Sequence, residues 1–177
     1  VVGRDTSYWD ATAALMAQFP GLMLTVHEIA TSGDRLMMRF TEHGRRQKDG
    51  AVCAWGGIAL YRWNGRQLLH CSVEQDYWSR RRQAEARSTD RVDAPLAAPW
   101  AVDAALPDAE AEEVVRRWLD AGGLQTTANV HCDADWTAEF QAIVLEHRSV
   151  EILDLFSIGN RVGFHVLQHG AVSAEFD

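Results

Sequence analysis

The second half of this sequence repeats part of the first half. When the chain is shifted by 126 residues, residues 26–44 align with residues 152–170, and four of the 19 aligned positions are identical. Composition alone predicts roughly one identity in a segment of this length. The apolar alternation is also in register, and each segment turns at a glycine, Gly33 or Gly159. We therefore predict the same β-hairpin twice; two unrelated hairpins with similar turns are the alternative.

The first half predicts an α+β module. Pro20-Gly21 ends a helix, and Asn64-Gly65 is a strong turn signal between two strands. The predicted elements are a helix ending near residue 19, strands over 22–30, 35–43, 52–63 and 67–76, and a helix over 77–87. Consecutive strands joined by short turns favour an antiparallel sheet.

The second half begins after a change in composition. Residues 88–108 contain three prolines and many alanines, which is typical of a linker. A helix is expected from Asp108, with acidic residues in its first turns and Arg116-Arg117 later. A strand pair over 150–167 follows. We expect a module over 1–87, a linker over 88–108 and a second module over 109–177.

Charge and hydropathy limit the partners. The net charge of −8 repels phosphate backbones, so we expect no nucleic-acid partner. No apolar run approaches the ~20 residues that span a bilayer, so we expect no membrane partner. The three cysteines cannot all pair and form no C-x-x-C motif, which favours reduced thiols and a cytoplasmic location.

An ordered set of motifs over residues 3–84 resembles the SnoaL-like polyketide cyclases, within the superfamily of nuclear transport factor two and ketosteroid isomerase. The matching positions are Phe19-Pro20, Gly33-Asp34-Arg35, Gly57, Tyr61-Arg62-Trp63, Asn64-Gly65, Asp76 and Gln83. Residues 109–177 resemble the first helix and the first long hairpin of the same family. Both copies lack parts of the family pattern, so we expect both to be incomplete in this sequence.

The resemblance implies a fold and an assembly. We expect a curved antiparallel sheet that forms a cone, with helices packed on its concave face and a small apolar pocket at its open end, repeated in tandem. The family commonly forms dimers through the sheet, so a homodimer is expected. We also expect the helix near 109–121 to cover the sheet of its own module or of the first one, because an uncovered apolar sheet is costly.

Asp76 is the main catalytic candidate, because the resemblance implies an acid/base residue at this position. A carboxylate that faces an apolar pocket loses hydration, and the resulting rise in pKa makes it a usable base. Alternation along the strand places His70, Ser72 and Asp76 on one face, so His70 is the candidate auxiliary donor. The alternative is that Asp76 only caps the helix that starts at Tyr77.

Apolar residues of the neighbouring strands are candidates for binding a ligand. Trp55, Tyr61 and Trp63 alternate along one strand and would form a flat wall for a small apolar or aromatic compound. Packing in the core or at a dimer interface is the alternative reading. The remaining ligand candidates are Met38 and Phe40 on the preceding strand and Ser72, which stands where the family usually has tryptophan.

No metal or cofactor is expected. His131, Cys132, Asp133 and Asp135 are adjacent in sequence, whereas a tetrahedral metal needs ligands that converge from separated positions. No glycine-rich phosphate loop is present. Two functions stay open: a cofactor-free acid/base enzyme of the cyclase or isomerase type acting on a polyketide-like or other carbonyl compound, and a non-catalytic module for binding small molecules or for dimerisation.

Overall fold

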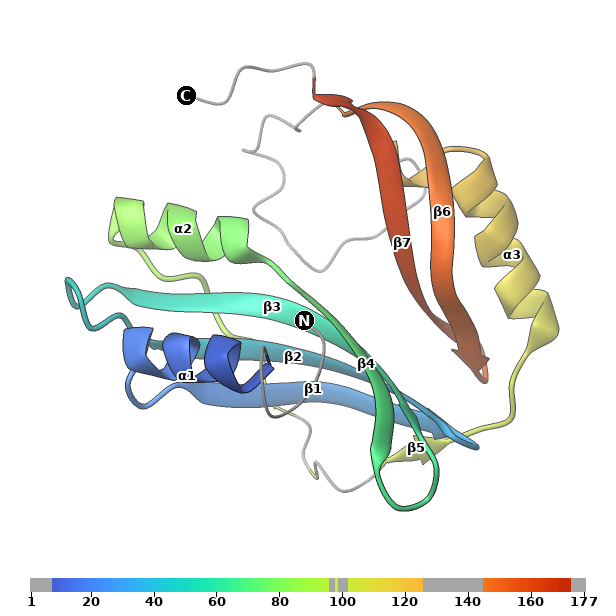
Figure 1. Ribbon diagram of the computed structural model, residues 1–177, viewed down its shortest axis with the longest axis horizontal. Helices are drawn as coiled ribbons and strands as arrows, with labels where there is room; N and C mark the ends of the chain where they lie inside the picture. The colour runs from blue at the N-terminus through green and yellow to red at the C-terminus, as the bar shows by residue number, and fades with distance from the viewer. Residues whose placement is uncertain (1–7, 96–97, 99–101, 126–144, 173–177) are drawn as a thin grey trace. The chain divides into compact units, whose positions relative to one another are not determined.

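The computed structural model describes residues 8–95, 98, 102–125 and 145–172. It divides into two compact units, Val1–Ala104 (unit 1) and Ala105–Asp177 (unit 2), and the described strands form one sheet in each (Figure 1). The potential metal ligands of the second half lie outside the described residues; they are His131, Cys132, Asp133 and Asp135. Within the described residues, no helix has the length and apolar character needed to cross a bilayer.

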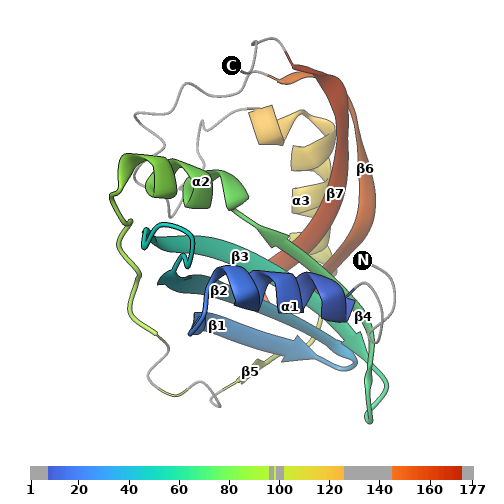
Figure 2. The same ribbon diagram turned by 60° about the vertical axis from the view of Figure 1, so that its left-hand side comes forward.

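Unit 1 is an α+β structure with a curved, mostly antiparallel sheet (Figure 2). The strand order is β4-β3-β2-β1-β5, and only the short β5 runs parallel to its neighbour. The elements are α1 (Trp9–Gln18), β1 (Met23–Ser32), β2 (Arg35–Arg45), β3 (Val52–Trp63), β4 (Leu68–Gln75), α2 (Tyr77–Ala86) and β5 (Asp103–Ala104).

The predicted turns are where the chain reverses. Gly33 joins β1 to β2 with φ of 57°, and Gly65 joins β3 to β4 with φ of 89°. These φ values lie in the left-handed region that glycine adopts at little cost. The glycines therefore made the positions of the turns predictable from the sequence. The third predicted strand, 52–63, has the same limits as β3.

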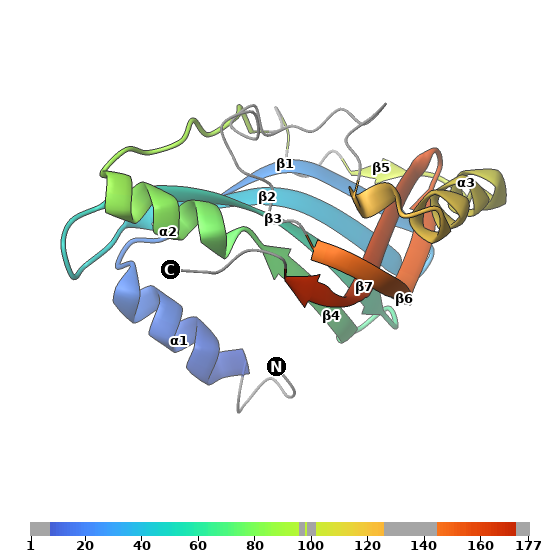
Figure 3. The same ribbon diagram turned by 90° about the horizontal axis from the view of Figure 1, so that it is seen from above.

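Both helices of unit 1 pack against one end of the sheet. Phe19, which follows α1, is 1% exposed, and its ring centroid lies 5.0 Å from that of Trp55 on β3. The buried cluster at this end also contains Cys53 of β3 and Ala84 of α2. Because Cys53 and Trp55 point to the same face of β3, the two helices cover the same face of the sheet (Figure 3).

The first part of β3 extends beyond the end of β4, and α2 pairs with it through one side chain. Gln83 is fully buried; its Oε1 accepts from the backbone N of Ala54 at 2.9 Å, and its Nε2 donates to the carbonyl oxygen of Ala54 at 2.5 Å. The amide thus satisfies both backbone groups that a further strand would have paired. Gln83 fixes α2 to the sheet edge.

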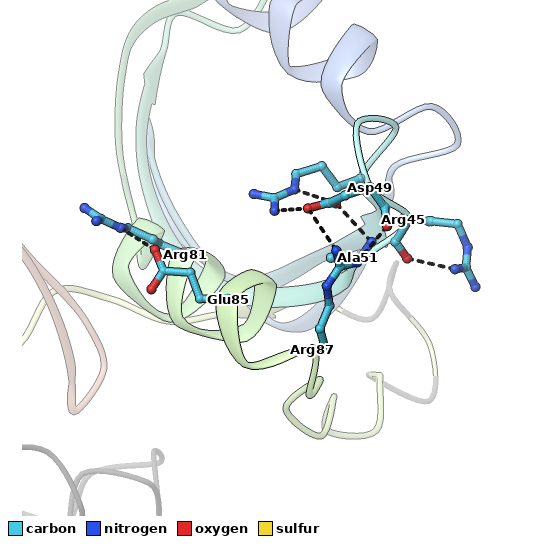
Figure 4. A network of polar contacts seen from close by, with 8 residues as sticks. Arg45, Asp49, Ala51, Arg81, Glu85 and Arg87 are labelled. Atoms are coloured by element: carbon cyan, nitrogen blue, oxygen red, sulfur yellow. Dashed lines mark hydrogen bonds and ion pairs between the residues drawn. The ribbon is translucent and has the colours of Figure 1, made fainter.

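The loop between β2 and β3 is held by charged side chains (Figure 4). Asp49 forms an ion pair with Arg46 and accepts from the backbone N of Ala51 at 3.2 Å. Hydrogen bonding to Arg46 holds the pKa of the Asp49 carboxyl well below its usual range. Arg87, just after α2, donates to the carbonyl oxygen of Asp49 at 2.6 Å, so the loop is joined to the end of that helix.

Unit 2 contains a helix on a two-stranded sheet. Its described elements are α3 (Ala109–Asp120), the short 3-10 helix η2 (Gly123–Gln125), β6 (Leu145–Ile158) and β7 (Arg161–Val172). Asp108 caps α3 by accepting from the backbone N atoms of Glu110 and Ala111. The α3 side chain of Glu112 accepts from the backbone N of Ser157 at 2.9 Å, and Trp118 packs edge-on against Phe164. The predicted helix therefore covers the sheet of its own unit.

The long hairpins of the two units are paired in the same way. Ser32 pairs with Arg35 in unit 1, and Ile158 pairs with Arg161 in unit 2, again an offset of 126 residues. The offset holds along both hairpins as far as a bulge, which falls between Val26 and Glu28 in one and between Ile152 and Asp154 in the other. Both turn glycines have φ of 57°.

Candidate functional site

One face of the unit 1 sheet is mostly apolar. Residues directly opposite each other in antiparallel strands share a face, so the register assigns each side chain to a side. We call the side that carries Trp55 and the two helices the apolar face; it comprises Val26, Ile29, Leu36, Met38, Phe40, Trp55, Gly57, Ala59, Tyr61 and Val73. Four of the predicted ligand residues, Met38, Phe40, Trp55 and Tyr61, are therefore on one side.

Burial along the apolar face is uneven. Phe40, Trp55 and Ala59 are buried, whereas Met38 and Tyr61 are half-buried and Val73 is exposed. The ring of Phe40 lies over Gly57, where an added Cβ would stand 2.4 Å from the Phe40 Cζ. Phe40 therefore occupies the space that a larger residue at 57 would fill. The face is closed near the helices and more accessible toward Tyr61 and Val73.

A carboxyl group is buried at the closed end of this face. Glu42 pairs with Trp55 across β2 and β3, so it lies on the apolar face, and it is 9% exposed. Its Oε2 is buried and has no hydrogen-bond partner among the described residues. Burial raises the pKa of the Glu42 carboxyl above its usual value, although hydrogen bonds from Gln75 and Trp55 and the charge of Arg80 each lower it.

A guanidinium group from α2 lies beside this carboxyl. The Cζ of Arg80 is 5.0 Å from the ring centroid of Trp55, 5.6 Å from that of Phe19 and 4.5 Å from that of Tyr77. These cation–π contacts hold a positive charge among three aromatic rings, of which those of Phe19 and Trp55 are buried. The indole Nε1 of Trp55 donates to Oε1 of Gln75 at 3.1 Å, so β3 and β4 are also joined here.

The more accessible end of the face offers a phenol. Tyr61 pairs with Cys71 across β3 and β4. Burial raises the pKa of Tyr61 to about 12, and Cys71 adds to the rise. Since the phenol stays protonated near neutral pH, Tyr61 can donate a hydrogen bond to a ligand oxygen but cannot act as a base there.

Asp76 has the capping role that the sequence left open beside catalysis. It is the N-cap of α2: Oδ1 accepts from the backbone N of Ser79 at 2.9 Å, and Oδ2 accepts from the Ser79 hydroxyl at 2.6 Å. Both carboxylate oxygens are therefore engaged within the first turn of the helix. An acid/base role for Asp76 stays a prediction, and it would require at least one of these bonds to open.

His70 and Ser72 are on the side of the sheet opposite the apolar face. They pair with Arg62 and Leu60 of β3, which alternate with Tyr61 and therefore point the other way. The imidazole Nε2 of His70 is 2.8 Å from the Ser72 hydroxyl. The register thus separates these two candidates from Met38, Phe40, Trp55 and Tyr61.

Trp63 stands at the end of β3, beyond a register shift between Arg62 and Trp63. Its side chain is 44% exposed, and its Nε1 donates to the carbonyl oxygen of Gly33 at 3.3 Å. The indole therefore braces the turn between β1 and β2. Whether it contacts a ligand stays a prediction.

Sequence reasoning missed Glu42, although a signal was present. Leu36, Met38 and Phe40 alternate on β2, and the same alternation continues to Glu42. An acidic residue at an apolar position of a strand is unusual, because burying a carboxylate is costly.

Among the described residues, no group of three or more histidine, cysteine or acidic side chains is placed to hold a metal ion.

Comparison with known proteins gives a structural similarity only. No protein-family model matches the sequence, and no curated protein matches it. Three similar solved structures are a candidate polyketide cyclase from Acidithiobacillus ferrooxidans (18% identity, TM-score 0.42), a candidate SnoaL-like polyketide cyclase from Jannaschia sp. CCS1 (16%, 0.41), and AclR, a candidate hydroxylase from Streptomyces galilaeus (16%, 0.44). The chain is similar to SnoaL-like polyketide cyclases.

These matches cover part of each protein. They include 46%, 45% and 53% of this chain, and 62%, 60% and 65% of the respective solved chains. The chain therefore spans less than two thirds of the length of each of these three solved structures.

Proposed function

We propose that unit 1 binds a small apolar or aromatic compound that carries a carbonyl group, and that it transfers a proton on this compound without a cofactor. The observation that supports this proposal is the apolar face, where a phenol at the accessible end and a carboxyl group at the closed end lie on the same side as the aromatic side chains. A mostly apolar surface with a few polar groups is typical of sites for small molecules. The products would be those of an isomerisation or an aldol-type cyclisation.

Truncating Tyr61 is expected to weaken ligand binding, whereas truncating His70 is not. The planar ketone 1-tetralone is a suitable probe, and calorimetric titration measures its dissociation constant. Because an aromatic contact contributes roughly 1 kcal/mol, Tyr61→Ala should weaken binding about five- to tenfold. His70→Ala is the matched control, since His70 is exposed on the opposite side of the sheet. Equal binding by both variants and the wild-type protein would contradict the proposal.

A non-catalytic binding module is the second candidate. One observation favours it: both oxygens of Asp76 accept from Ser79, and His70 lies on the other side of the sheet, so the two residues first considered for catalysis do not meet on the apolar face. Under this alternative the ligand binds to the apolar face and leaves unchanged.

Three further expectations belong to the same proposal. We propose that unit 2 is a second module of the same type, which the equal pairing of the two hairpins supports. The resemblance to SnoaL-like proteins supports a cone-shaped sheet and a homodimer. A cytoplasmic location is proposed from the free thiols of Cys53 and Cys71.

A further inference from the structure

We propose that Glu42, rather than Asp76, is the acid/base residue of unit 1, acting on a C–H bond next to the carbonyl group of a small apolar ketone. This inference rests on the proposed function, because it requires a ligand on the apolar face. It assigns the proton transfer to a residue on that face, whereas the carboxylate of Asp76 is bonded within α2.

The placement of Glu42 is the first argument. Most buried polar atoms in folded proteins have a hydrogen-bond partner, so a buried carboxyl oxygen without one needs an explanation. Oε2 of Glu42 has none among the described residues, and the side chain is 9% exposed beside Trp55. A stabilising structural role would satisfy both oxygens, as Ser79 does for Asp76. An oxygen that is free to accept a proton is what a base requires.

The surroundings of Glu42 are the second argument. The Glu42 carboxyl faces Arg80 of α2, Trp55 of β3 and Gln75 of β4. Arg80 in turn interacts with Tyr77 and Cys53. On β1 the partner of Glu42 is the apolar Leu24. Arg46, which follows β2, acts on the guanidinium of Arg80. One cation and two N–H donors thus stand beside one carboxyl group in an otherwise apolar setting.

This arrangement supports a balanced proton transfer. The Glu42 carboxylate takes a proton from the carbon next to the carbonyl group, and the C–H electron pair becomes the C=C bond of an enolate whose oxygen is negative. The nearby guanidinium of Arg80 stabilises that charge. The enolate then regains the proton from Glu42 at another carbon, which is an isomerisation, or attacks a second carbonyl in the same molecule, and the resulting alkoxide takes the proton.

The first test uses the ligand-free protein. Carbon-13 NMR of labelled glutamate carboxyl groups follows each titration, and Glu42→Gln identifies the Glu42 signal. The Glu42 midpoint should lie above 4.5, the usual value, because burial disfavours the charged form. Glu74→Gln on the opposite side of β4 is the matched control. A Glu42 midpoint at or below the usual value would overturn the proposal.

The pH dependence of the protein's stability also tests the protonation of Glu42. Because the folded protein holds the Glu42 proton to a higher pH than the unfolded chain does, the stabilising contribution is complete below 4.5 and is lost as pH rises through the raised pKa. Glu42→Gln should therefore shift the urea midpoint upward at pH 7 and leave it unchanged at pH 4. A downward shift at pH 7 would show a structural carboxylate and overturn the proposal.

The second test measures the base directly with 5-nitrobenzisoxazole, a small planar probe. A carboxylate that removes its C–H proton makes a nitrile and breaks the N–O bond to give a coloured phenolate. Because general-base catalysis typically contributes at least 100-fold, Glu42→Gln should lower the rate about 100-fold and Glu42→Asp should restore part of it. Glu74→Gln, on the opposite side of β4, should leave the rate unchanged within twofold. The wild-type rate should rise with pH through the Glu42 pKa.

The outcomes separate the two proposals. If the probe binds the wild-type protein and Glu42→Gln retains the full rate, the assignment of Glu42 is overturned while the binding function stands. If Asp76→Asn loses the rate instead, Asp76 is the base. If the probe does not bind at all, the proposed function is wrong and the substrate role of Glu42 is overturned with it.

Discussion

Replacing Trp55 with alanine is expected to lower the free energy of unfolding of unit 1 by about 4 kcal/mol. The side chain is 1% exposed, packs against Phe19 and Arg80, and donates to Gln75. Its removal leaves a cavity where α1, α2 and the sheet meet. Amide hydrogen exchange over residues 52–60 measures the effect, because it reports the opening of β3 independently of unit 2.

Trp63→Ala is the matched control for Trp55→Ala, since both residues lie on β3. The Trp63 side chain is 44% exposed and makes one long hydrogen bond to Gly33, so its truncation should cost less than about 1 kcal/mol. Comparable losses for the two tryptophans would show that the Trp55 end is not the core of unit 1.

Replacing Gln83 with alanine is expected to cost about 3 kcal/mol, because it leaves the buried N–H and C=O of Ala54 unpaired. The variant also removes the acceptor for the backbone N of Asp90 at 3.0 Å. Fluorescence of Trp55 during urea unfolding, isolated by difference from a Trp55→Phe background, follows the change. Detachment of α2 should accompany the loss of stability.

Two further variants make the Gln83 prediction specific. Gln83→Glu keeps an acceptor for the Ala54 N–H but places a carboxylate against its carbonyl oxygen, so it should be at least as destabilising as alanine. Glu85→Ala removes an exposed α2 side chain that pairs with Arg81, and should cost less than about 0.5 kcal/mol. If the Gln83 variants keep the wild-type free energy of unfolding while Glu85→Ala lowers it, the edge-pairing role of Gln83 is contradicted.

The elements of unit 1 were largely predictable because their signals are local. Glycine at Gly33 and Gly65 permits the observed turns, and Pro20 follows the end of α1. Strand limits follow from alternation between such turns, as for β3. The role of Gln83 was not predictable, because its partner Ala54 is 29 residues away and the bond depends on how α2 crosses the sheet edge.

The composition of the candidate site was only partly predictable for the same reason. Alternation says which residues of one strand share a face, but the register between strands decides which faces coincide. The pairing of Ser72 with Leu60 places His70 and Ser72 away from Tyr61, a fact that no single strand contains. The position of Glu42 on the apolar face follows from alternation with Phe40, but its burial beside Trp55 and Arg80 depends on tertiary packing that the sequence of β2 does not contain.

The most direct test of the binding face uses the methionine methyl groups, of which the protein has four. Met38 and Met37 are neighbours on β2 that point to opposite sides of the sheet, so they form an internal control. With carbon-13-labelled methionine and 1-tetralone as the probe, the methyl signal of Met38 should shift progressively to saturation while that of Met37 stays in place. A shift of Met37 without a shift of Met38 would contradict binding on the apolar face.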